Sequence, residues 1–221
     1  MNSLARFVGL DLRSLRPVAR AFLFSTTLVV VAAVIPLGSP YPIIPAMAML
    51  VLLLVPQQLF GNDERGKLDT LYAALGIRRA RVVAGRYATS LVSVLAAMLA
   101  GVLLAPLFAL TLRTDFDWRT GIVLAFASLA AIGTVFAAEL PVYFALGASR
   151  ARSTGVAIHV ALIGIVVVIG VAFPAVGTWL VAMVDSVPIA LVAAITLAVV
   201  LAVGIASLRL AARLYVRRDI R

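Results

Sequence analysis

The chain of 221 residues contains no cysteine, a single histidine and only nine acidic residues. Without cysteine it can form neither a disulfide nor a thiolate that would act as nucleophile or metal ligand. Its one histidine has no matching acidic residue nearby in the sequence, so it does not define a metal site. No group of Asp, Glu, His or Ser shows a spacing suited to metal or nucleophilic catalysis. We therefore predict a non-catalytic chain with no cofactor and no metal of its own.

Apolar residues are abundant instead. They make up 64% of the chain, and the mean hydropathy is +1.15, whereas soluble domains are roughly 45–50% apolar. A helix of about 20 apolar residues crosses the hydrocarbon of a bilayer. Six stretches approach or exceed this length: Ala21–Leu37, Ile43–Phe60, Tyr87–Leu112, Gly121–Leu146, Gly155–Leu180 and Val187–Leu208. We predict an all-α membrane protein in which residues 1–221 form a single domain of six transmembrane helices.

The formal net charge of +10 would suggest nucleic acid as a partner of a soluble protein. Here the positions of the charges exclude that partner. If six helices alternate in direction, all but two of the nineteen basic residues lie on one side of the membrane, the exceptions being Arg113 and Arg119. The positive-inside rule then places both termini in the cytoplasm, with residues 209–221 as a basic tail. The basic residues orient the chain and contact anionic membrane lipid.

Residues 1–20 are predicted to form an interfacial amphipathic helix on the inner leaflet. Arg13 and Arg16 interrupt any apolar core here, so the segment is not a cleavable signal peptide. One face of the helix carries Leu4, Phe7, Val8, Leu12 and Leu15, and the other carries Arg6, Arg13 and Arg16. An ordinary basic flank of the first span remains the alternative.

A charge-rich cytoplasmic loop, residues 61–86, separates the second and third predicted spans. Within it an apolar set recurs at helical spacing, followed by Gly76 as a helix stop: Leu68, Leu71, Tyr72 and Leu75. Such a short helix is marginal in water by itself, so its apolar face needs a surface to pack against. Lipid headgroups, the protein's own bundle and a cytoplasmic partner are the three possibilities.

The run Gly61-Asn62-Asp63-Glu64-Arg65-Gly66-Lys67 fits the first seven positions of a phosphate-binding P-loop. Its eighth residue is Leu68, which has no hydroxyl for Mg²⁺. Asp63 and Glu64 would also place negative charge where phosphates must sit. We therefore predict that this chain does not bind nucleotide.

The same region resembles the cytoplasmic loop of ABC exporter permeases of the type-2 class. The resemblance rests on the acidic pair Asp63-Glu64, the short helix, and the run Leu75-Gly76-Ile77-Arg78-Arg79-Ala80-Arg81-Val82-Val83-Ala84-Gly85-Arg86-Tyr87. Arg79, Val83 and Arg86 match the family's positions, whereas Gly76 and Arg78 replace its Pro and Ser. The stretch from Leu140-Pro141 through Arg152 is similar to the end of the fourth helix in one branch of that family.

This resemblance implies that the short helix is a coupling helix, which docks into a groove of a separate ATPase. The implied partners are two cytoplasmic ABC ATPase subunits, which hold the ATP and Mg²⁺, and a second permease subunit in a homodimer or heterodimer. The implied location is the plasma membrane, in a bacterium the inner membrane. The residues assigned to ATPase coupling are Asp63, Glu64, Leu68, Leu71, Tyr72, Leu75, Arg79 and Arg86.

Two ionisable residues lie within the predicted spans, Glu139 and His159. Glu139 precedes Pro141 in the fourth span, where an acidic group is costly without a partner or water. It either serves function, by binding a cation or relaying a proton, or serves structure, by capping backbone freed by Pro141 or bonding across a dimer. His159 is interpreted as a hydrogen-bonded residue at a helix interface.

The function favoured by these observations is that of a permease subunit in an ATP-driven exporter of an amphipathic or hydrophobic solute, such as a peptide, drug or lipid. The alternative is a stand-alone proton-coupled secondary transporter that uses Glu139. The apolar walls do not select among solutes.

The charge asymmetry generates a topology prediction. Because the chain has no native cysteine, single cysteines placed at Asn2 and Arg221 can be labelled without background. Both are expected to be protected from an impermeant maleimide in intact cells and labelled after permeabilisation. A cysteine placed at Asp115, in the predicted external loop, is the control that should label from outside. External labelling of either terminus would contradict the topology.

Overall fold

The computed structural model describes residues 3–15, 18–155 and 186–217, together with positions 157, 161 and 172. Among these residues every regular element is helical, and no strand occurs. In chain order the elements are α1 (Ser3–Ser14), α2 (Val18–Val29), the π-helical segment η1 (Val30–Val34), α3 (Ile35–Leu37), α4 (Ile43–Gly66), α5 (Leu68–Ala74), α6 (Arg79–Leu112), α7 (Trp118–Leu146) and α10 (Ile189–Arg217). The all-helical class predicted from the sequence is confirmed.

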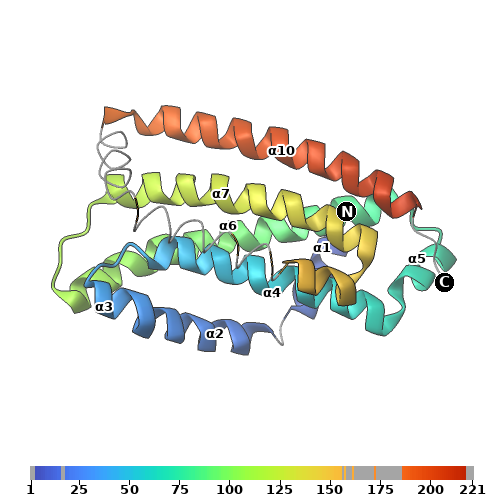
Figure 1. The fold of residues 1–221 in the computed structure, drawn as a ribbon, viewed down its shortest axis with the longest axis horizontal. Helices are drawn as coiled ribbons and strands as arrows, with labels where there is room; N and C mark the ends of the chain where they lie inside the picture. Colours follow the sequence, from blue (N-terminus) through green and yellow to red (C-terminus); the bar gives the residue numbers. More distant parts are fainter. Residues whose placement is uncertain are drawn as a thin grey trace.

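Five helical stretches are long and apolar enough to cross a membrane: Arg20–Leu37, Ile43–Gly66, Arg79–Leu112, Trp118–Leu146 and Ile189–Arg217. Each overlaps a span predicted from hydropathy. The other predicted span, Gly155–Leu180, lies outside the described residues except for a few positions. Helices α7 and α10 run in the same direction (Figure 1). They correspond to the fourth and sixth predicted spans, which must be parallel if six spans alternate in direction. The total of six remains a prediction.

The long helices lie side by side, with α2 and α10 on opposite edges of the bundle (Figure 1). α10 packs chiefly against α7, while α2 packs against α4. The enclosed core consists mainly of α4, α6 and α7 side chains, including Ile44, Leu59 and Leu140. The end of the bundle that carries α5 also holds α1 and the C-terminal end of α10 (Figure 1). We call this end the α5 end.

The predicted cytoplasmic loop 61–86 is for the most part helical, which corrects the predicted boundaries of the second and third spans. α4 continues past Phe60 to Gly66, and α6 begins at Arg79 rather than Tyr87. A span predicted from hydropathy stops at the first charged residues. The helix itself can continue through charged residues whose side chains are paired or solvated. α4 stops at Lys67, whose left-handed backbone (φ 48°) lets its N–H donate to the carbonyls of Asp63 and Glu64.

The predicted short helix forms as α5. It follows α4 after the single residue Lys67 and ends before Gly76, whose φ of +64° is a conformation that glycine adopts without strain. Gly76 is therefore the helix stop predicted from the sequence. The close spacing of α4, α5 and α6 along the chain limits how far α5 can move independently of the two spans beside it.

Two glycines of α6 allow neighbouring helices to approach its backbone. A Cβ on Gly101 would lie 3.0 Å from the Cα of Ile44, so α4 and α6 are in close contact there. At Gly85, the ring of Phe7 from α1 occupies the space that a Cβ would need. These small residues therefore let both α4 and α1 pack closely against α6. Close packing at small residues is common between helices in a membrane, where the hydrophobic effect does not drive helices together.

Two hydroxyl groups of α10 attach that helix to α7. Ser207 Oγ donates to the carbonyl of Ala137 at 2.5 Å, and Thr196 Oγ1 donates to the carbonyl of Phe126 at 3.3 Å. Hydrogen bonds of this kind join helices within a membrane, where apolar contact with a neighbour differs little from contact with lipid.

The end of the bundle opposite α5 is held by aromatic packing and by a helix cap. Tyr41 stacks on Phe116 with ring centroids 5.4 Å apart, and its hydroxyl accepts from the N–H of Asp117 at 2.9 Å. The Asp117 carboxylate caps α7 by accepting from the backbone N–H and the hydroxyl of Thr120. The Thr120 side-chain hydrogen bond is the main cause that lowers the pKa of Asp117.

Candidate functional site

The candidate site is α5 together with the residues that hold it at its end of the bundle. The predicted apolar face of α5 is divided between the protein and its surface. Tyr72 packs against the core, with its ring 5.8 Å from that of Phe7. Leu71 and Leu75 are 49% and 65% exposed, and Leu68 is half-buried. α5 is thus anchored on one side and presents two leucines on the other.

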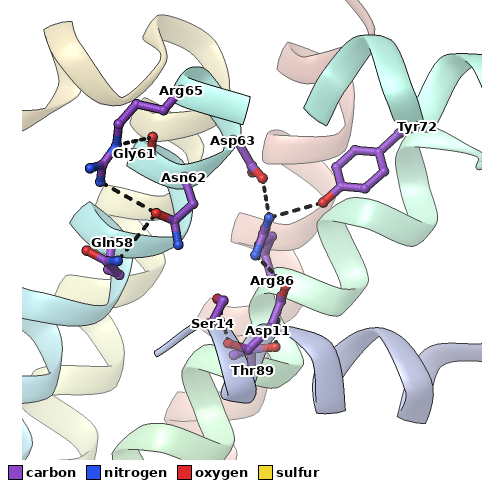
Figure 2. Close-up of polar contacts among 10 residues, drawn as sticks. All are labelled: Asp11, Ser14, Gln58, Gly61, Asn62, Asp63, Arg65, Tyr72, Arg86 and Thr89. Carbon is purple, nitrogen blue, oxygen red and sulfur yellow. Dashed lines mark hydrogen bonds and ion pairs between the residues drawn. The ribbon is translucent and has the colours of Figure 1, made fainter. Parts of the chain in front are cut away.

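Arg86 is the centre of the polar contacts behind α5. Its side chain is 2% exposed, and Figure 2 shows it between Asp11, Asp63 and Tyr72. Arg86 Nη1 lies 2.7 Å from Asp11 Oδ1, and Nη2 lies 2.5 Å from Asp63 Oδ1. Nη2 also donates to the Tyr72 hydroxyl at 3.4 Å. One guanidinium therefore joins α6 to α1, α4 and α5.

Further contacts complete this cluster. Thr89, one turn after Arg86 on α6, donates from Oγ1 to Asp11 Oδ2 at 3.2 Å. The guanidinium carbon lies 5.5 Å from the centre of the Phe7 ring, within range of a cation–π contact. We call Asp11, Asp63, Tyr72, Arg86 and Thr89 the Arg86 cluster.

Burial and charge act on Asp11 in opposite senses. Burial raises the pKa of the Asp11 carboxyl above its ordinary value, and the nearby Arg86 guanidinium and the Thr89 hydrogen bond oppose that rise. Burying charged groups is costly unless each one is paired and hydrogen-bonded. The planar guanidinium meets this requirement because its several N–H donors point in fixed directions toward two carboxylates at once.

The two members of the acidic pair have different roles in the structure. Asp63 turns inward to Arg86, whereas Glu64 is exposed and accepts from the backbone N–H of Ser149 at 3.1 Å and from its hydroxyl at 3.5 Å. Ser149 is the second of the helical residues 148–155 that follow α7, in the first turn, where backbone N–H groups lack partners within the helix. Glu64 thereby connects the end of α4 to the chain beyond α7.

Arg79 attaches the end of α10 to the start of α6. Its Nη1 donates to the carbonyls of Tyr215 and Val216 at 2.9 and 2.8 Å, and its guanidinium carbon lies 5.5 Å from the centre of the Tyr215 ring. Carbonyls in the last turn of a helix have no partners within it, and an arginine satisfies them and complements the helix dipole. Arg79 therefore binds within the chain at the α5 end.

The P-loop-like run lies in the last turns of α4 and is helical as far as Gly66. A phosphate-binding loop cradles its ligand with free backbone N–H groups. In a helix those N–H groups are bonded to carbonyls one turn earlier. The geometry of this run thus differs from that of a nucleotide site.

Of the two predicted intramembrane polar residues, Glu139 lies in the described part of the chain. Glu139 is 2% exposed on α7, and a Cβ on Gly155 would lie 3.5 Å from its Oε1 and 3.6 Å from the Tyr143 hydroxyl. Glu139 thus lies beside the residues that follow α7 and far along the chain from the α5 contacts. His159 lies outside the described residues, so its predicted role stays a prediction. In the described part of the chain, no three His, Cys, Asp or Glu residues are grouped to hold a metal.

The sequence interpretation missed Asp11, Thr89 and Ser149. For Asp11 a signal was present, because it follows Phe7 by four positions and precedes Leu15 by four, which places a carboxylate on the apolar face of α1. Phe7 and Leu15 do pack against the core, whereas Leu12 is 38% exposed. The apolar face of α1 therefore turns at least partly toward the bundle, and its predicted interfacial role remains a prediction.

Comparison with protein families decides what kind of membrane protein carries this site. The family described as "ABC-2 family transporter protein" matches residues 8–216. The chain belongs to this family. No curated protein and no solved structure matches it. The match spans the Arg86 cluster and α5, and it confirms the resemblance to ABC-2 permeases found in the sequence.

Membership in the ABC-2 family makes this chain a multi-pass membrane component of an ABC transporter. Permeases of this family are generally non-catalytic and associate with an ABC ATPase. The α5 end of this permease carries a short helix, a buried charge cluster and the C-terminal end of α10 next to one another.

The Arg86 cluster generates a stability prediction. Arg86→Gln removes the cation shared by Asp11 and Asp63, and removing one partner of a buried ion pair typically costs about 3–5 kcal/mol. The variant is expected to unfold at a clearly lower temperature in detergent than the parent. Arg81→Gln, an exposed arginine on the same helix, is the matched control and should change little.

The cluster should also behave as a coupled unit. Combining Arg86→Gln with Asp11→Asn is expected to destabilise the permease by less than the sum of the two single changes, by about 0.5–3 kcal/mol. Strict additivity, or a parent-like melting temperature for Arg86→Gln, would contradict the role assigned to this ion pair.

Proposed function

We propose that this permease is the membrane half of an ATP-driven exporter that moves an amphipathic or hydrophobic solute outward. Two separate ATPase subunits would bind ATP and Mg²⁺, and a second permease subunit would complete the pathway. The observation that carries the proposal is the arrangement of α5, a short helix held from behind by Tyr72 with Leu71 and Leu75 exposed.

An amphipathic helix with exposed leucines one turn apart suits a groove on a protein partner. Leu71 and Leu75 are the residues of α5 that would enter such a groove. Tyr72, Arg79, Arg86 and Asp63 make their contacts within the permease. We propose that these four transmit coupling from behind the interface, and that the leucines form the contact itself.

The contacts behind α5 suggest how a movement of the ATPases would reach the spans. Lys67 alone separates α5 from α4, and Arg86 joins α5 to α6 and α1 through the cluster. Glu64 extends the connection from α4 to the residues after α7. A displacement of α5 would therefore move the α5 ends of several helices together, as expected of a rigid-body switch between inward-facing and outward-facing states.

The coupling proposal predicts the effect of shortening the two exposed leucines. Leu71→Ala with Leu75→Ala should insert and fold normally, because both side chains project from the bundle. If they are central anchors, each truncation costs about 2 kcal/mol or more in ATPase binding. Copurification of the ATPase subunit and stimulation of its ATP hydrolysis by the permease are the measurements.

The matched control is Leu99→Ala with Leu103→Ala, two exposed leucines at the same spacing in the middle of α6. This pair should leave ATPase recruitment unchanged. Equal recruitment by the α5 variant and the control would show that α5 is a lipid-facing connector, and the proposal would then fail.

Glu139 separates the exporter from a proton-coupled carrier. Because ATP supplies the energy in the proposed mechanism, Glu139→Gln is expected to retain ATP-dependent efflux of fluorescent amphipathic dyes, with altered packing or dye preference. That efflux should also persist in the presence of a protonophore. Loss of efflux in the variant, together with sensitivity of the parent to the protonophore, would instead favour the carrier.

A further inference from the structure

A cavity of about 380 Å³ lies between α6, α7 and α10, and no residue of the Arg86 cluster lines it. Ligand pockets in proteins usually measure about 300–1,000 Å³, so this space is large enough for a bound molecule. Its walls are mostly apolar, and Val94, Leu129, Phe136 and Leu140 line its interior. Leu91, Leu201 and Ile205 also line it, and each is about half exposed. The cavity therefore opens sideways, toward the lipid.

One polar side chain in this apolar space has no partner. Ser90 lines the cavity and is 3% exposed, and among the described residues no group forms a hydrogen bond with its hydroxyl. A buried hydroxyl without a partner is costly, so such a group points to a missing ligand or water. The neighbouring Tyr87 hydroxyl is not available in the same way, because it bonds to Ser207 Oγ at 2.5 Å.

A basic residue stands at the rim of the cavity nearest the α5 end. Arg209 of α10 lines it and is exposed. At 1.5 Å per residue, Ser90 lies about 16 Å along α6 from Arg79, and Arg209 lies about 12 Å before Arg217 at the end of α10. Arg209 therefore lies about 4 Å nearer the α5 end than Ser90 does, and the cavity residues Val94 and Leu129 lie farther from that end than both.

This order of groups matches a lipid molecule in a bilayer. An acyl chain suits the apolar interior, an ester carbonyl can accept from a hydroxyl at the base of the headgroup, and an anionic phosphate is attracted to arginine near the membrane surface. We propose that the cavity between α6, α7 and α10 binds one anionic membrane lipid, with its acyl chain beside Leu129 and Phe136, its ester at Ser90 and its headgroup at Arg209.

The hydrogen bonds that join the three helices also shape this site. Ser207 accepts from the hydroxyl of Tyr87 on α6 and donates to the Ala137 carbonyl of α7. These bonds fix the spacing of the helices without using Ser90. The proposed lipid would thus bind to a preformed space on one permease subunit, independently of α5 and of any ATPase.

The test uses the full chain in nanodiscs of phosphatidylcholine with a small fraction of phosphatidylglycerol that bears a diazirine in its acyl chain. After illumination, the labelled peptides are identified by mass spectrometry. Labelling should concentrate on the segments of α6, α7 and α10 that line the cavity. Unlabelled phosphatidylglycerol should compete more strongly than phosphatidylcholine.

Gly204→Leu tests the cavity itself. A Cβ on Gly204 meets nothing within 4 Å, and this residue lines the cavity, so a leucine there would fill the space where the acyl chain is proposed to lie. Labelling of the lining segments should fall to the level of exposed lipid-facing peptides. Ala202→Leu, an exposed position on the same helix that does not line the cavity, is the matched control and should label like the parent.

Arg209→Gln and Ser90→Ala test the polar ends without changing the shape of the cavity. Arg209→Gln removes one cation near the membrane surface, which should lower the preference for the anionic lipid about fivefold. Arg213→Gln, one turn further along α10, removes the same charge outside the cavity and is the control. Ser90→Ala should lower lipid labelling of the lining segments about fivefold, because the loss of one hydrogen bond to the lipid ester weakens binding by about that factor.

Two results would overturn the proposal. One is unchanged labelling in Gly204→Leu together with unchanged lipid preference in Arg209→Gln. The other is labelling spread evenly over the surface while Gly204→Leu disrupts a dimer on size-exclusion chromatography, which would identify the cavity as a contact between two copies of the permease.

Discussion

The arrangement of this permease at its α5 end depends on one buried ion pair network, in which the Arg86 guanidinium contacts the carboxylates of Asp11 and Asp63. A cation buried in an otherwise apolar bundle requires nearby anions, and here they come from α1 and from the last turns of α4. The same guanidinium reaches Tyr72 on α5. Four helices therefore meet at one side chain, and the position of α5 follows from theirs.

The anchoring of α5 explains how a helix of only seven residues can be stable and still offer a binding surface. An isolated helix of this length would not persist in water. Tyr72, packed on Phe7 and bonded to Arg86, supplies the tertiary contact, and the αL residue Lys67 and Gly76 set the two ends. Leu71 and Leu75 are then left exposed on a fixed scaffold, which lowers the entropy lost when a partner binds them.

The attachment of α10 differs from that of the central helices. α10 is held through hydroxyl-to-carbonyl bonds at Thr196 and Ser207 and, at its end, through Arg79 on α6. These contacts are spread along the helix, and the cavity lies between them. A peripheral helix attached at separate points can leave space beside it for lipid, whereas α4, enclosed by its neighbours, cannot.

The sequence by itself determined the membrane class, the places of the five described spans and the existence of α5, because each depends on local properties: apolar length, helical spacing and a glycine stop. It also placed Arg79 and Arg86 among residues of interest through family resemblance. The tertiary structure decided how far α4 and α6 extend and which groups pair. Asp11 and Asp63 reach Arg86 from separate helices, and hydropathy cannot distinguish a charge that is solvated in a loop from one that is paired inside a bundle. The division of the α5 face into an anchored tyrosine and exposed leucines likewise depends on the packing of α1 against α6, because that contact places the Phe7 ring next to the ring of Tyr72.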